Sequence, residues 1–328
     1  MTLEASPRDL PESSVPAESP GDSPQAVDTP LTRAAVFLVL TISDADGSIA
    51  IVRDVLGGID DLVKTVNFRD MRASLVCVAS IGVRVWDAVT GLPRPAELHE
   101  FQPVVGAVHT APATAGDLLF HVRADSADLC FEFERLLLAG LGEAVEVVDE
   151  TIGFRYFDAR DLLGFVDGTA NPVGRALPAA TMVGDEDPLH AGGSYVVAQK
   201  YVHDMTAWQA LTTEQQQAVM GRTKVDNVEL ADAESGQKSH KTLNTIQDEQ
   251  GEHGILRDNM PFGSAAAGEF GTYFLGYTRR LWVIERMLQR MFIGDPPGLH
   301  DRLLDVSTPK TGNVFFAPSA ETLASLGD

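Results

Sequence analysis

The feature that most restricts the fold is a series of apolar segments whose order occurs twice along the chain. Short apolar runs bounded by polar or turn-forming residues predict buried strands, and apolar residues at every third or fourth position predict amphipathic helices. In the first half, the predicted strands are 34–42, 74–82, 116–124 and 143–150, and the predicted helices are 48–64 and the segment that carries Leu129, Phe133, Leu136 and Leu137.

The second half repeats this order without detectable sequence identity to the first. The first and third strands lie 82 residues apart in one half (36 to 118) and 77 residues apart in the other (195 to 272). This near-equal spacing predicts two copies of one β-α-β-β-α-β unit, the ferredoxin-like topology. The predicted strands are 194–202, 271–279 and 312–318, and the predicted helices are 205–222 and the segment that carries Leu281, Ile284, Leu288 and Met291.

We therefore expect an α+β fold in which two ferredoxin-like domains pack their sheets together or join them into a barrel. The start of the chain is rich in Pro, Ser, Glu and Asp and has no apolar periodicity, which predicts a disordered leader. The predicted divisions are a leader at 1–32, an N-terminal domain at 33–155, a connecting segment at 156–192, a C-terminal domain at 193–320 and a tail at 321–328.

The charge and the apolar content exclude several kinds of partner. A formal net charge of −22 argues against nucleic acid and anionic membranes, because phosphate contacts need a basic surface. No apolar run approaches the roughly 20 residues that a spanning helix needs, and the N-terminus lacks the pattern of a signal peptide. The two cysteines, Cys77 and Cys130, have apolar neighbours and no CxxC spacing, which predicts buried thiols and a cytoplasmic protein.

One loop, GFVDGTANP at 164–172, joins the two halves and carries a single carboxylate, Asp167. Gly164 and Gly168 allow the backbone to turn tightly, and Pro172 prevents a helix from continuing. Apolar residues directly before the acid predict a loop that is tucked inward. Asp167 is then either a turn-forming residue that accepts a hydrogen bond from its own backbone or a functional acid.

Three polar residues of the second half stand among apolar or glycine-rich neighbours. His240 follows a polar turn, and Arg257 and Asn259 lie two positions apart, so they share a face if the segment is extended. Each has an ordinary structural alternative, such as a hydrogen-bonded surface histidine or an arginine that forms a salt bridge at the edge of the core.

Asp301 and Asp305 lie four positions apart in DRLLDVS and would share one face of a short helix, where acids normally face solvent. The other histidines have no metal-ligand spacing such as HxxxH or HExxH, and the chain has no GxGxxG, P-loop or GxSxG motif. The sequence therefore gives no support for zinc hydrolysis, nucleotide binding or serine chemistry. These other histidines are His99, His109, His121, His190, His203, His253 and His300.

Four motifs in this order resemble those of the dye-decolorizing peroxidases, a family of haem enzymes. They are GFVDGTANP at 164, SHKTLN at 239, ILRDNMPFG at 255 and DRLLDVS at 301. The resemblance covers about residues 32–319, and the absence of large insertions makes the chain most similar to the B-type branch. The family's fold, a pair of ferredoxin-like domains, agrees with the duplication found independently in the apolar pattern.

The resemblance implies roles for individual residues. The family's proximal histidine, which binds the iron of haem b, falls on His240. Its distal aspartate, arginine and asparagine fall on Asp167, Arg257 and Asn259.

The resemblance also implies a carboxylate that hydrogen-bonds to the proximal histidine, and this carboxylate falls in DRLLDVS. It corresponds to Asp301 or Asp305, of which we prefer Asp301.

These residue types suit peroxide chemistry. An imidazole ligand backed by a carboxylate leaves one side of the haem iron open and stabilises iron in high oxidation states. On the open side, Asp167 can relay a proton between the peroxide oxygens, and Arg257 can stabilise the departing hydroxide. The resemblance thus implies a peroxidase that reduces hydrogen peroxide through an oxyferryl intermediate and oxidises dyes, phenolics or other one-electron donors.

Two other functions stay open at this stage. One is a haem-handling protein for iron supply, and the other is a metal-free ferredoxin-like binding module in which His240 and Asp167 are structural. The family commonly forms oligomers, so a homo-oligomer is expected. The last strand is followed closely by ASLGD, without the longer tail by which some members enter encapsulin shells, which argues against such a shell as a partner.

Overall fold

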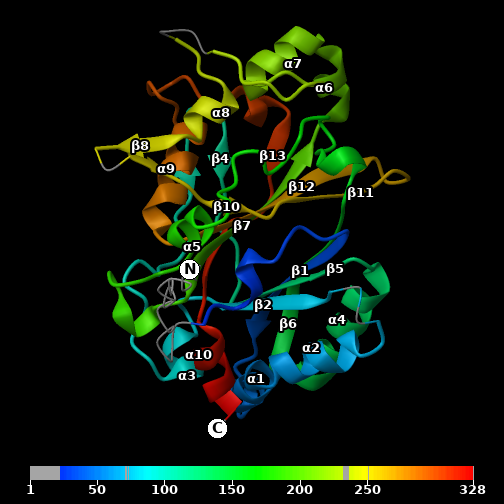
Figure 1. The fold of residues 1–328 in the computed structure, drawn as a ribbon, viewed down its shortest axis with the longest axis vertical. Coiled ribbons are helices and arrows are strands. Elements are labelled where there is room, and N and C mark those ends of the chain that lie inside the picture. Colours follow the sequence, from blue (N-terminus) through cyan, green and yellow to red (C-terminus); the bar gives the residue numbers. More distant parts are fainter. Residues whose placement is uncertain (1–22, 71, 73, 232–235, 250, 328) are drawn as a thin grey trace, which may run out of the picture.

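The computed structural model describes residues 23–70, 72, 74–231, 236–249 and 251–327. In its N-terminal half, antiparallel strands form a sheet in the order β6-β1-β5-β2, which is the strand order of a ferredoxin-like unit (Figure 1). The elements are β1 (Ala34–Ile42), α1 (Ser48–Gly57), α2 (Ile59–Asn67), β2 (Val76–Ile81), α3 (Trp86–Thr90), β3 (Val104–Val105), β4 (Thr110–Ala111), β5 (Leu118–Ala124), α4 (Ala127–Leu141) and β6 (Val145–Phe154).

The C-terminal half has the same topology, with strands in the order β14-β7-β12 and then β11 and β10, which both pair with β12. The elements are α5 (Ala176–Thr181), β7 (Ser194–His203), α6 (Met205–Ala210), α7 (Thr213–Met220), α8 (His240–Leu243), β8 (Ile246–Asp248), β9 (Gly251–His253), β10 (Leu256–Arg257), β11 (Met260–Ser264), β12 (Glu269–Thr278), α9 (Leu281–Phe292), β13 (Ser307–Pro309), β14 (Asn313–Ala317) and α10 (Ala320–Ala324).

The two sheets meet at both edges. Phe316 of β14 pairs with Ile81 of β2, and Phe262 of β11 pairs with Gly153 of β6, so the strands close into a ring. Its interior is mostly apolar and includes Phe37, Leu119, Val196, Leu275 and Phe315, all fully buried. A buried ion pair between Arg123 and Asp258 lies there as well. The predicted duplicated α+β fold is confirmed.

Burial on both faces explains why β1 is a continuous apolar run. Val36, Leu38 and Leu40 pack toward the helices of the N-terminal half, whereas Phe37 and Val39 point into the ring. Helices α1, α2 and α4 cover the outer face of this sheet, and α9 packs on β7 and β12 of the other.

Two predicted helices are each interrupted. The segment 48–64 forms α1 and α2, with the break at Gly57 and Gly58. A side chain at Gly57 would collide with the backbone of Gly327, so this glycine lets the C-terminal turn lie against α1. The segment 205–222 forms α6 and α7, and Thr212 begins α7 with a capping box.

The predicted leader needs a correction. Its residues 1–22 lie outside the described part of the chain, whereas 23–32 are placed against the fold. The side chain of Gln25 is buried and donates hydrogen bonds to the carbonyl oxygens of Ala79 and Pro318. Residues 23–32 are therefore part of the fold, although they were predicted to belong to the leader.

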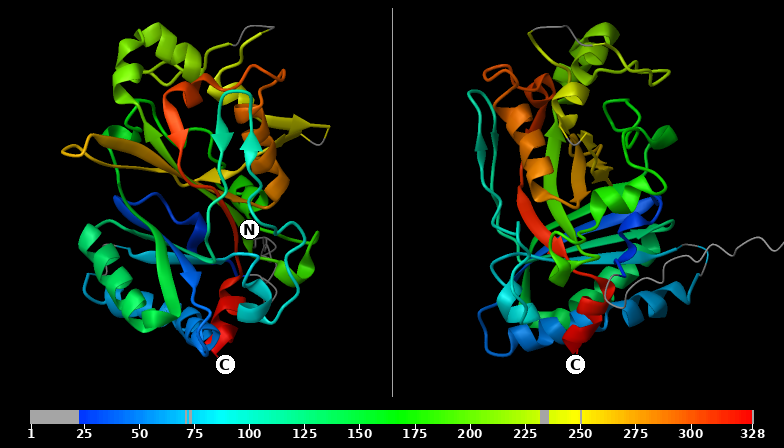
Figure 2. Two further views of the ribbon diagram at one scale, coloured as in Figure 1. Left: turned by 180° about the vertical axis from the view of Figure 1, so that it is seen from behind. Right: turned by 60° about the vertical axis from the view of Figure 1, so that its left-hand side comes forward.

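A hairpin of the N-terminal half reaches the C-terminal half. Strands β3 and β4 form this hairpin, which runs beside α9 (Figure 2). Within the described residues, no helix is long and apolar enough to cross a membrane. Cys77 and Cys130 are free, buried thiols, as predicted.

Candidate active site

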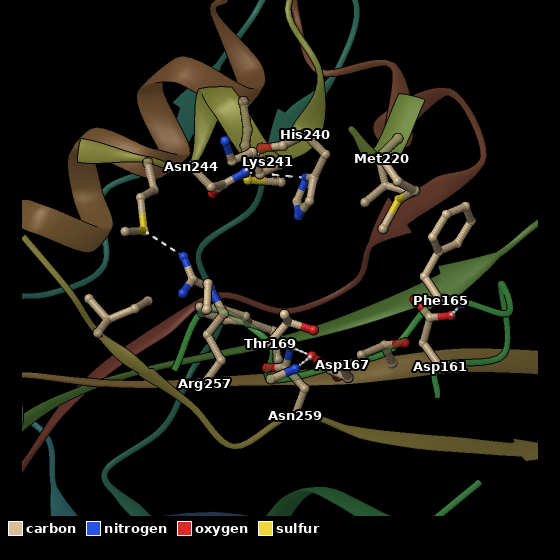
Figure 3. Close-up of a pocket in the computed structure, with 18 of the residues that line it drawn as sticks. Asp161, Phe165, Asp167, Thr169, Met220, His240, Lys241, Asn244, Arg257 and Asn259 are labelled. Atoms are coloured by element: carbon tan, nitrogen blue, oxygen red, sulfur yellow. Dashed lines mark hydrogen bonds between the residues drawn. The ribbon is translucent and has the colours of Figure 1, made fainter. Parts of the chain in front are cut away.

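A cavity of about 350 Å³ opens in the C-terminal half, between β7 and β12 on one side and α8 and α9 on the other. The loop at 164–172 contributes part of its wall (Figure 3). Much of the remaining wall is apolar, including Phe165, Met220, Ile255, Phe274, Ile284, Met287, Leu288 and Met291. A cavity with a large apolar wall and convergent polar groups is typical of a cofactor site.

His240 lies at the first position of α8, and its imidazole points into the cavity (Figure 3). The side chain of Ser239 caps this short helix and so fixes the position of the histidine. Nδ1 of His240 lies 2.6 Å from Oδ2 of Asp301. This pairing places the proton on Nδ1 and leaves the lone pair of Nε2 free for a metal.

Asp301 has a buried carboxylate with no solvent exposure. Its second oxygen, Oδ1, accepts a hydrogen bond from the N–H of Leu303 at 3.0 Å, because Asp301 caps a turn of 3-10 helix, Arg302–Asp305. Both oxygens therefore have donors, which holds the carboxylate behind His240. The geometry supports the preference for Asp301.

Asp305 does not share a face with Asp301, and the expectation of one common helical face is wrong. The segment is a tight turn rather than an α-helix, so the two side chains diverge. Asp305 does not line the cavity, and its carboxylate contacts His109 and His300 instead.

Asp167, Arg257 and Asn259 lie on the wall opposite His240 (Figure 3). Oδ1 of Asp167 accepts hydrogen bonds from the N–H of Gly168 at 2.7 Å and from Nδ2 of Asn259 at 3.3 Å. Burial raises the pKa of the Asp167 carboxyl above its ordinary value, although these two bonds and the charge of Arg257 oppose the rise.

Arg257 points its guanidinium into the cavity. Among the residues that the structure describes, the one hydrogen-bond partner of this guanidinium is Sδ of Met287, at 3.6 Å, which is a weak acceptor. Burial lowers the pKa of Arg257, whereas the charges of Asp167 and Glu252 raise it. The cation is therefore available to a ligand in the cavity.

Asn171, which no sequence pattern singled out, holds Arg257 in place. Its Oδ1 accepts from the N–H of Arg257 at 2.9 Å, and its Nδ2 donates to the carbonyl of Arg257 at 2.8 Å. The residue belongs to the same loop as Asp167, so the loop positions both the acid and the cation. The available signal was the amide residue directly before Pro172 in GFVDGTANP.

The sequence did not single out two further carboxyl groups, half-buried Asp161 and buried Asp258. Asp161 lines the cavity, and burial raises its pKa to about 7. Asp258, between Arg257 and Asn259, points the opposite way and pairs with Arg123 of β5. This alternation along an extended segment is why Arg257 and Asn259 face the cavity together.

Comparison with known proteins identifies the family. Two models match nearly the whole chain, "Dyp-type peroxidase, N-terminal" over residues 24–155 and "Dyp-type peroxidase, C-terminal" over 158–322. The chain belongs to the Dyp-type peroxidase family.

A dye-decolorizing peroxidase of Mycobacterium tuberculosis is 53% identical over 305 residues, which cover 93% of this chain and 90% of that protein. DypB from Rhodococcus jostii RHA1 is 55% identical, with a TM-score of 0.90 over 93% of this chain and 99% of that one. An encapsulated DyP-type peroxidase from Mycobacterium smegmatis is 53% identical, with a TM-score of 0.89 over 92% of this chain and 98% of that one.

Dyp-type peroxidases are haem enzymes, so the predicted B-type family, the haem peroxidase function and haem b as the cofactor are confirmed. The site fits this cofactor, because His240 offers Nε2 to the cavity while Asp301 holds Nδ1, and apolar walls enclose the space in between. The alternative of a metal-free binding module has no support.

Proposed function

We propose that His240 binds the haem iron of this peroxidase and that Asp167, Arg257 and Asn259 act together on hydrogen peroxide. One observation carries the assignment: a single cavity has the imidazole, fixed by buried Asp301, on one side and an acid, a cation and an amide on the other. Haem supplies an iron that binds peroxide and accepts electrons in two single steps.

Asp167 acts as the base that takes a proton from peroxide and returns it to the outer oxygen. The carboxylate is held by Gly168 and Asn259, so its free oxygen atom, Oδ2, is oriented before peroxide arrives. The raised pKa of Asp167 makes its carboxylate a stronger base, so its proton affinity is closer to that of the peroxide oxygens between which it transfers the proton.

Arg257 stabilises negative charge on the oxygen that departs. The guanidinium faces the cavity, and a sulfur atom is its only hydrogen-bond partner in the described part of the chain, so its donors remain available for that oxygen. Asn171 fixes the backbone of Arg257 on both sides of the residue. Asn259 orients Asp167 and receives the N–H of Leu275 on its own Oδ1, at 3.3 Å.

The partners follow from the family. Hydrogen peroxide and small one-electron donors are the substrates, and we infer two domains with boundaries near 33–155 and 193–320. We also infer a homo-oligomer. The relative from Mycobacterium smegmatis is described as encapsulated, so the expectation that this chain has no encapsulin partner is not confirmed. We keep the cytoplasmic location as a prediction.

Rapid mixing of the haem-loaded protein with hydrogen peroxide tests these roles. We expect a fast change of the haem spectrum in the parent, slowed by about 10²–10³-fold in Arg257→Leu, because one charge-stabilising donor is lost. Asp167→Asn should slow it as well. A Phe157→Ala variant, changed at an exposed residue near the loop, is the control and should react like the parent.

Two outcomes would contradict the proposal. If the parent binds haem but reacts with peroxide no faster than free haem, the protein is a haem carrier. If both Asp167→Asn and Arg257→Leu react as fast as the parent, the assigned wall does not act on peroxide.

A further inference from the structure

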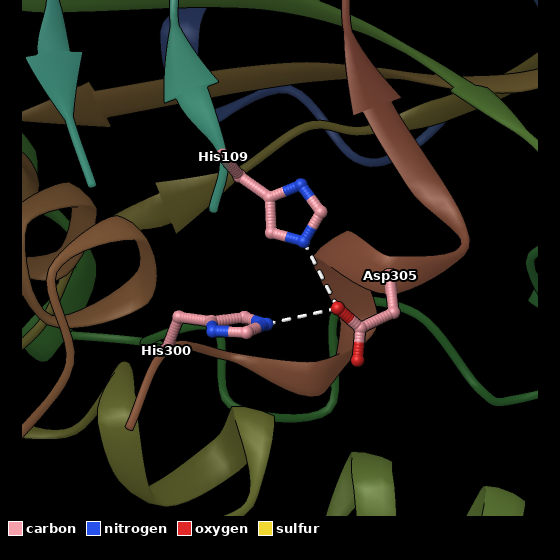
Figure 4. Close-up of side chains that lie close together, drawn as sticks. All are labelled: His109, His300 and Asp305. Atoms are coloured by element: carbon pink, nitrogen blue, oxygen red, sulfur yellow. Dashed lines mark hydrogen bonds and ion pairs between the residues drawn. The ribbon is translucent and has the colours of Figure 1, made fainter. Parts of the chain in front are cut away.

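Two imidazoles and one carboxylate converge outside the cavity (Figure 4). Nε2 of His109 lies 2.9 Å from Oδ1 of Asp305, and Nε2 of His300 lies 2.8 Å from the same oxygen. The two rings meet edge to face, with centroids 4.9 Å apart. Three potential ligand atoms therefore point at one another, although no spacing in the sequence predicts the cluster.

The three residues come from three separate segments. His109 directly precedes β4 in the hairpin of the N-terminal half, His300 follows α9, and Asp305 ends the turn that Asp301 caps. The hairpin lies beside α9 in both further views of the fold (Figure 2). The cluster thus joins the hairpin to the segment that holds Asp301 behind His240.

The chemistry and spacing suit a metal ion. All three ligand atoms lie within 4.8 Å of one another, so modest side-chain rotations would bring each of them to about 2.0–2.2 Å from a single ion. Imidazole nitrogen with carboxylate oxygen is the donor set that Zn²⁺ and the neighbouring late transition metals bind best. Each Nε2 can give up its proton when the ion binds.

The burial also favours an ion. The side chains of His109 and His300 are 23% and 20% exposed, so packing holds both rings in place. Asp305 is 52% exposed, which leaves solvent a way to the site and room for water as a further ligand. The formal net charge of −22 adds a general attraction for cations.

We propose that His109, His300 and Asp305 form a binding site for a divalent late transition-metal ion such as Zn²⁺. The ion is separate from haem iron, and it ties the β3–β4 hairpin to the 300–305 segment. Binding of the ion involves no change in its oxidation state. Water completes the coordination.

Other histidine–carboxylate pairs of the described chain provide the contrast. His99 contacts Glu285 and His253 contacts Asp248, each with one imidazole and one carboxylate. Two donors bind an ion far more weakly than three, so these pairs are expected to stay metal-free at micromolar concentrations of the ion. His99→Ala is therefore a matched control for His109→Ala.

Calorimetric titration of the full-length, haem-loaded protein with Zn²⁺ tests the proposal. Haem loading occupies His240, so its imidazole cannot contribute. We expect one ion per chain with a micromolar or tighter Kd, weakened by about 100-fold or more in His109→Ala and in Asp305→Asn. His99→Ala should bind like the parent. Zn²⁺ should raise the melting temperature of the parent and of His99→Ala, but not of His109→Ala.

Spectra separate loss of the site from loss of the fold. An unchanged Soret band shows that a variant is folded and holds haem, and His300→Gln replaces His109→Ala if that variant fails this check. Zinc X-ray absorption of the parent should show two imidazole ligands. Absence of micromolar binding, equal binding in parent and variants, or a zinc environment without imidazole would overturn the proposal.

Discussion

The two halves of the molecule share one topology, but they use the space between sheet and helices differently. In the N-terminal half, side chains such as Leu38, Val52, Phe120 and Phe133 fill this space completely. In the C-terminal half, the space beside α9 is a cavity lined by His240 and by the wall that carries Arg257. The same fold therefore serves stability in one half and chemistry in the other.

The difference arises from the segment between the first and third strands, which is no longer in the C-terminal half than in the N-terminal half but has different content. Between the first and third strands, the C-terminal half carries α8 with His240 and two short strands, β10 and β11, that flank Asp258 and Asn259. The loop at 164–172 then closes the cavity from outside the repeat. Polar residues from α8, from the β10–β11 segment and from this loop line the cavity, which leaves space for a cofactor.

The largest effect on stability is expected from the filled half. Phe133 of α4 is fully buried, so Phe133→Ala should lower the free energy of unfolding by about 3–5 kcal/mol, through lost burial and a new cavity. Denaturant unfolding measures this change. Phe131→Ala, in the same helix but 63% exposed, is the control and should cost little.

The comparison of the halves requires that this destabilised protein still react with peroxide. Per bound haem, the rate constant of Phe133→Ala should stay within about twofold of the parent, because additivity holds for distant sites. A large loss of rate with haem still bound would show that the two halves are not functionally separate.

A smaller effect is expected from the carboxylate behind His240. Asp301→Asn should weaken haem binding or slow the peroxide reaction by about 10–100-fold, because a residue that orients a metal ligand is lost. Asp305→Asn is the matched control, since Asp305 belongs to the same turn but contacts His109 and His300. Equal effects of the two variants would contradict the assignment of Asp301.

A still smaller effect is expected from Asn171. Asn171→Ala removes both hydrogen bonds to the backbone of Arg257 and should slow the peroxide reaction by about tenfold, as expected for about 1–3 kcal/mol of lost interaction. Haem affinity should change little, because Asn171 does not hold His240. If Asn171→Ala lost haem affinity to the same extent as it lost rate, the loop would stabilise the fold rather than the position of Arg257.

The smallest expected effect is the change with pH in the rate constant for peroxide. If Asp167 must be ionised, the rate constant for peroxide falls as pH decreases through its pKa, which burial places above the ordinary value of 3.8. Arg257, His240, Asp161 and Asp258 are charged or titratable groups that interact with it electrostatically. Rates should therefore be lower at pH 4 than at pH 7, and Asp167→Asn should remove this acidic decline.

A second variant identifies the group that titrates. Asp161 has a pKa raised to about 7, so Asp161→Asn should keep the acidic decline if Asp167 is the base. A decline that disappears in Asp161→Asn, but persists in Asp167→Asn, would assign the base to Asp161.

The sequence predicted the duplicated fold because most strands are buried on both faces and read as apolar runs. It did not predict β10 and β11, whose short, mixed segments have no clear period. The helix breaks near Gly57 and Thr212 were not predicted either. They depend on the C-terminal turn that packs against Gly57 and on the capping box at Thr212.

At the site, four motifs were enough to select His240, Asp167, Arg257 and Asn259, which the structure brings to one cavity. The choice between Asp301 and Asp305 needed the actual turn, since helical spacing placed them together. The cluster at His109 could not be predicted, because His109 lies 196 positions from Asp305 in the sequence and the hairpin brings the two together.

Binding of haem to the apoprotein tests the central claim most directly. In the parent, titration with haem b should produce a sharp Soret band at one haem per chain, with the spectrum of iron bound to one imidazole. In His240→Ala, this band should be lost, and added imidazole should restore part of it. A His240→Ala protein that binds haem with the parent's affinity and spectrum would contradict the account.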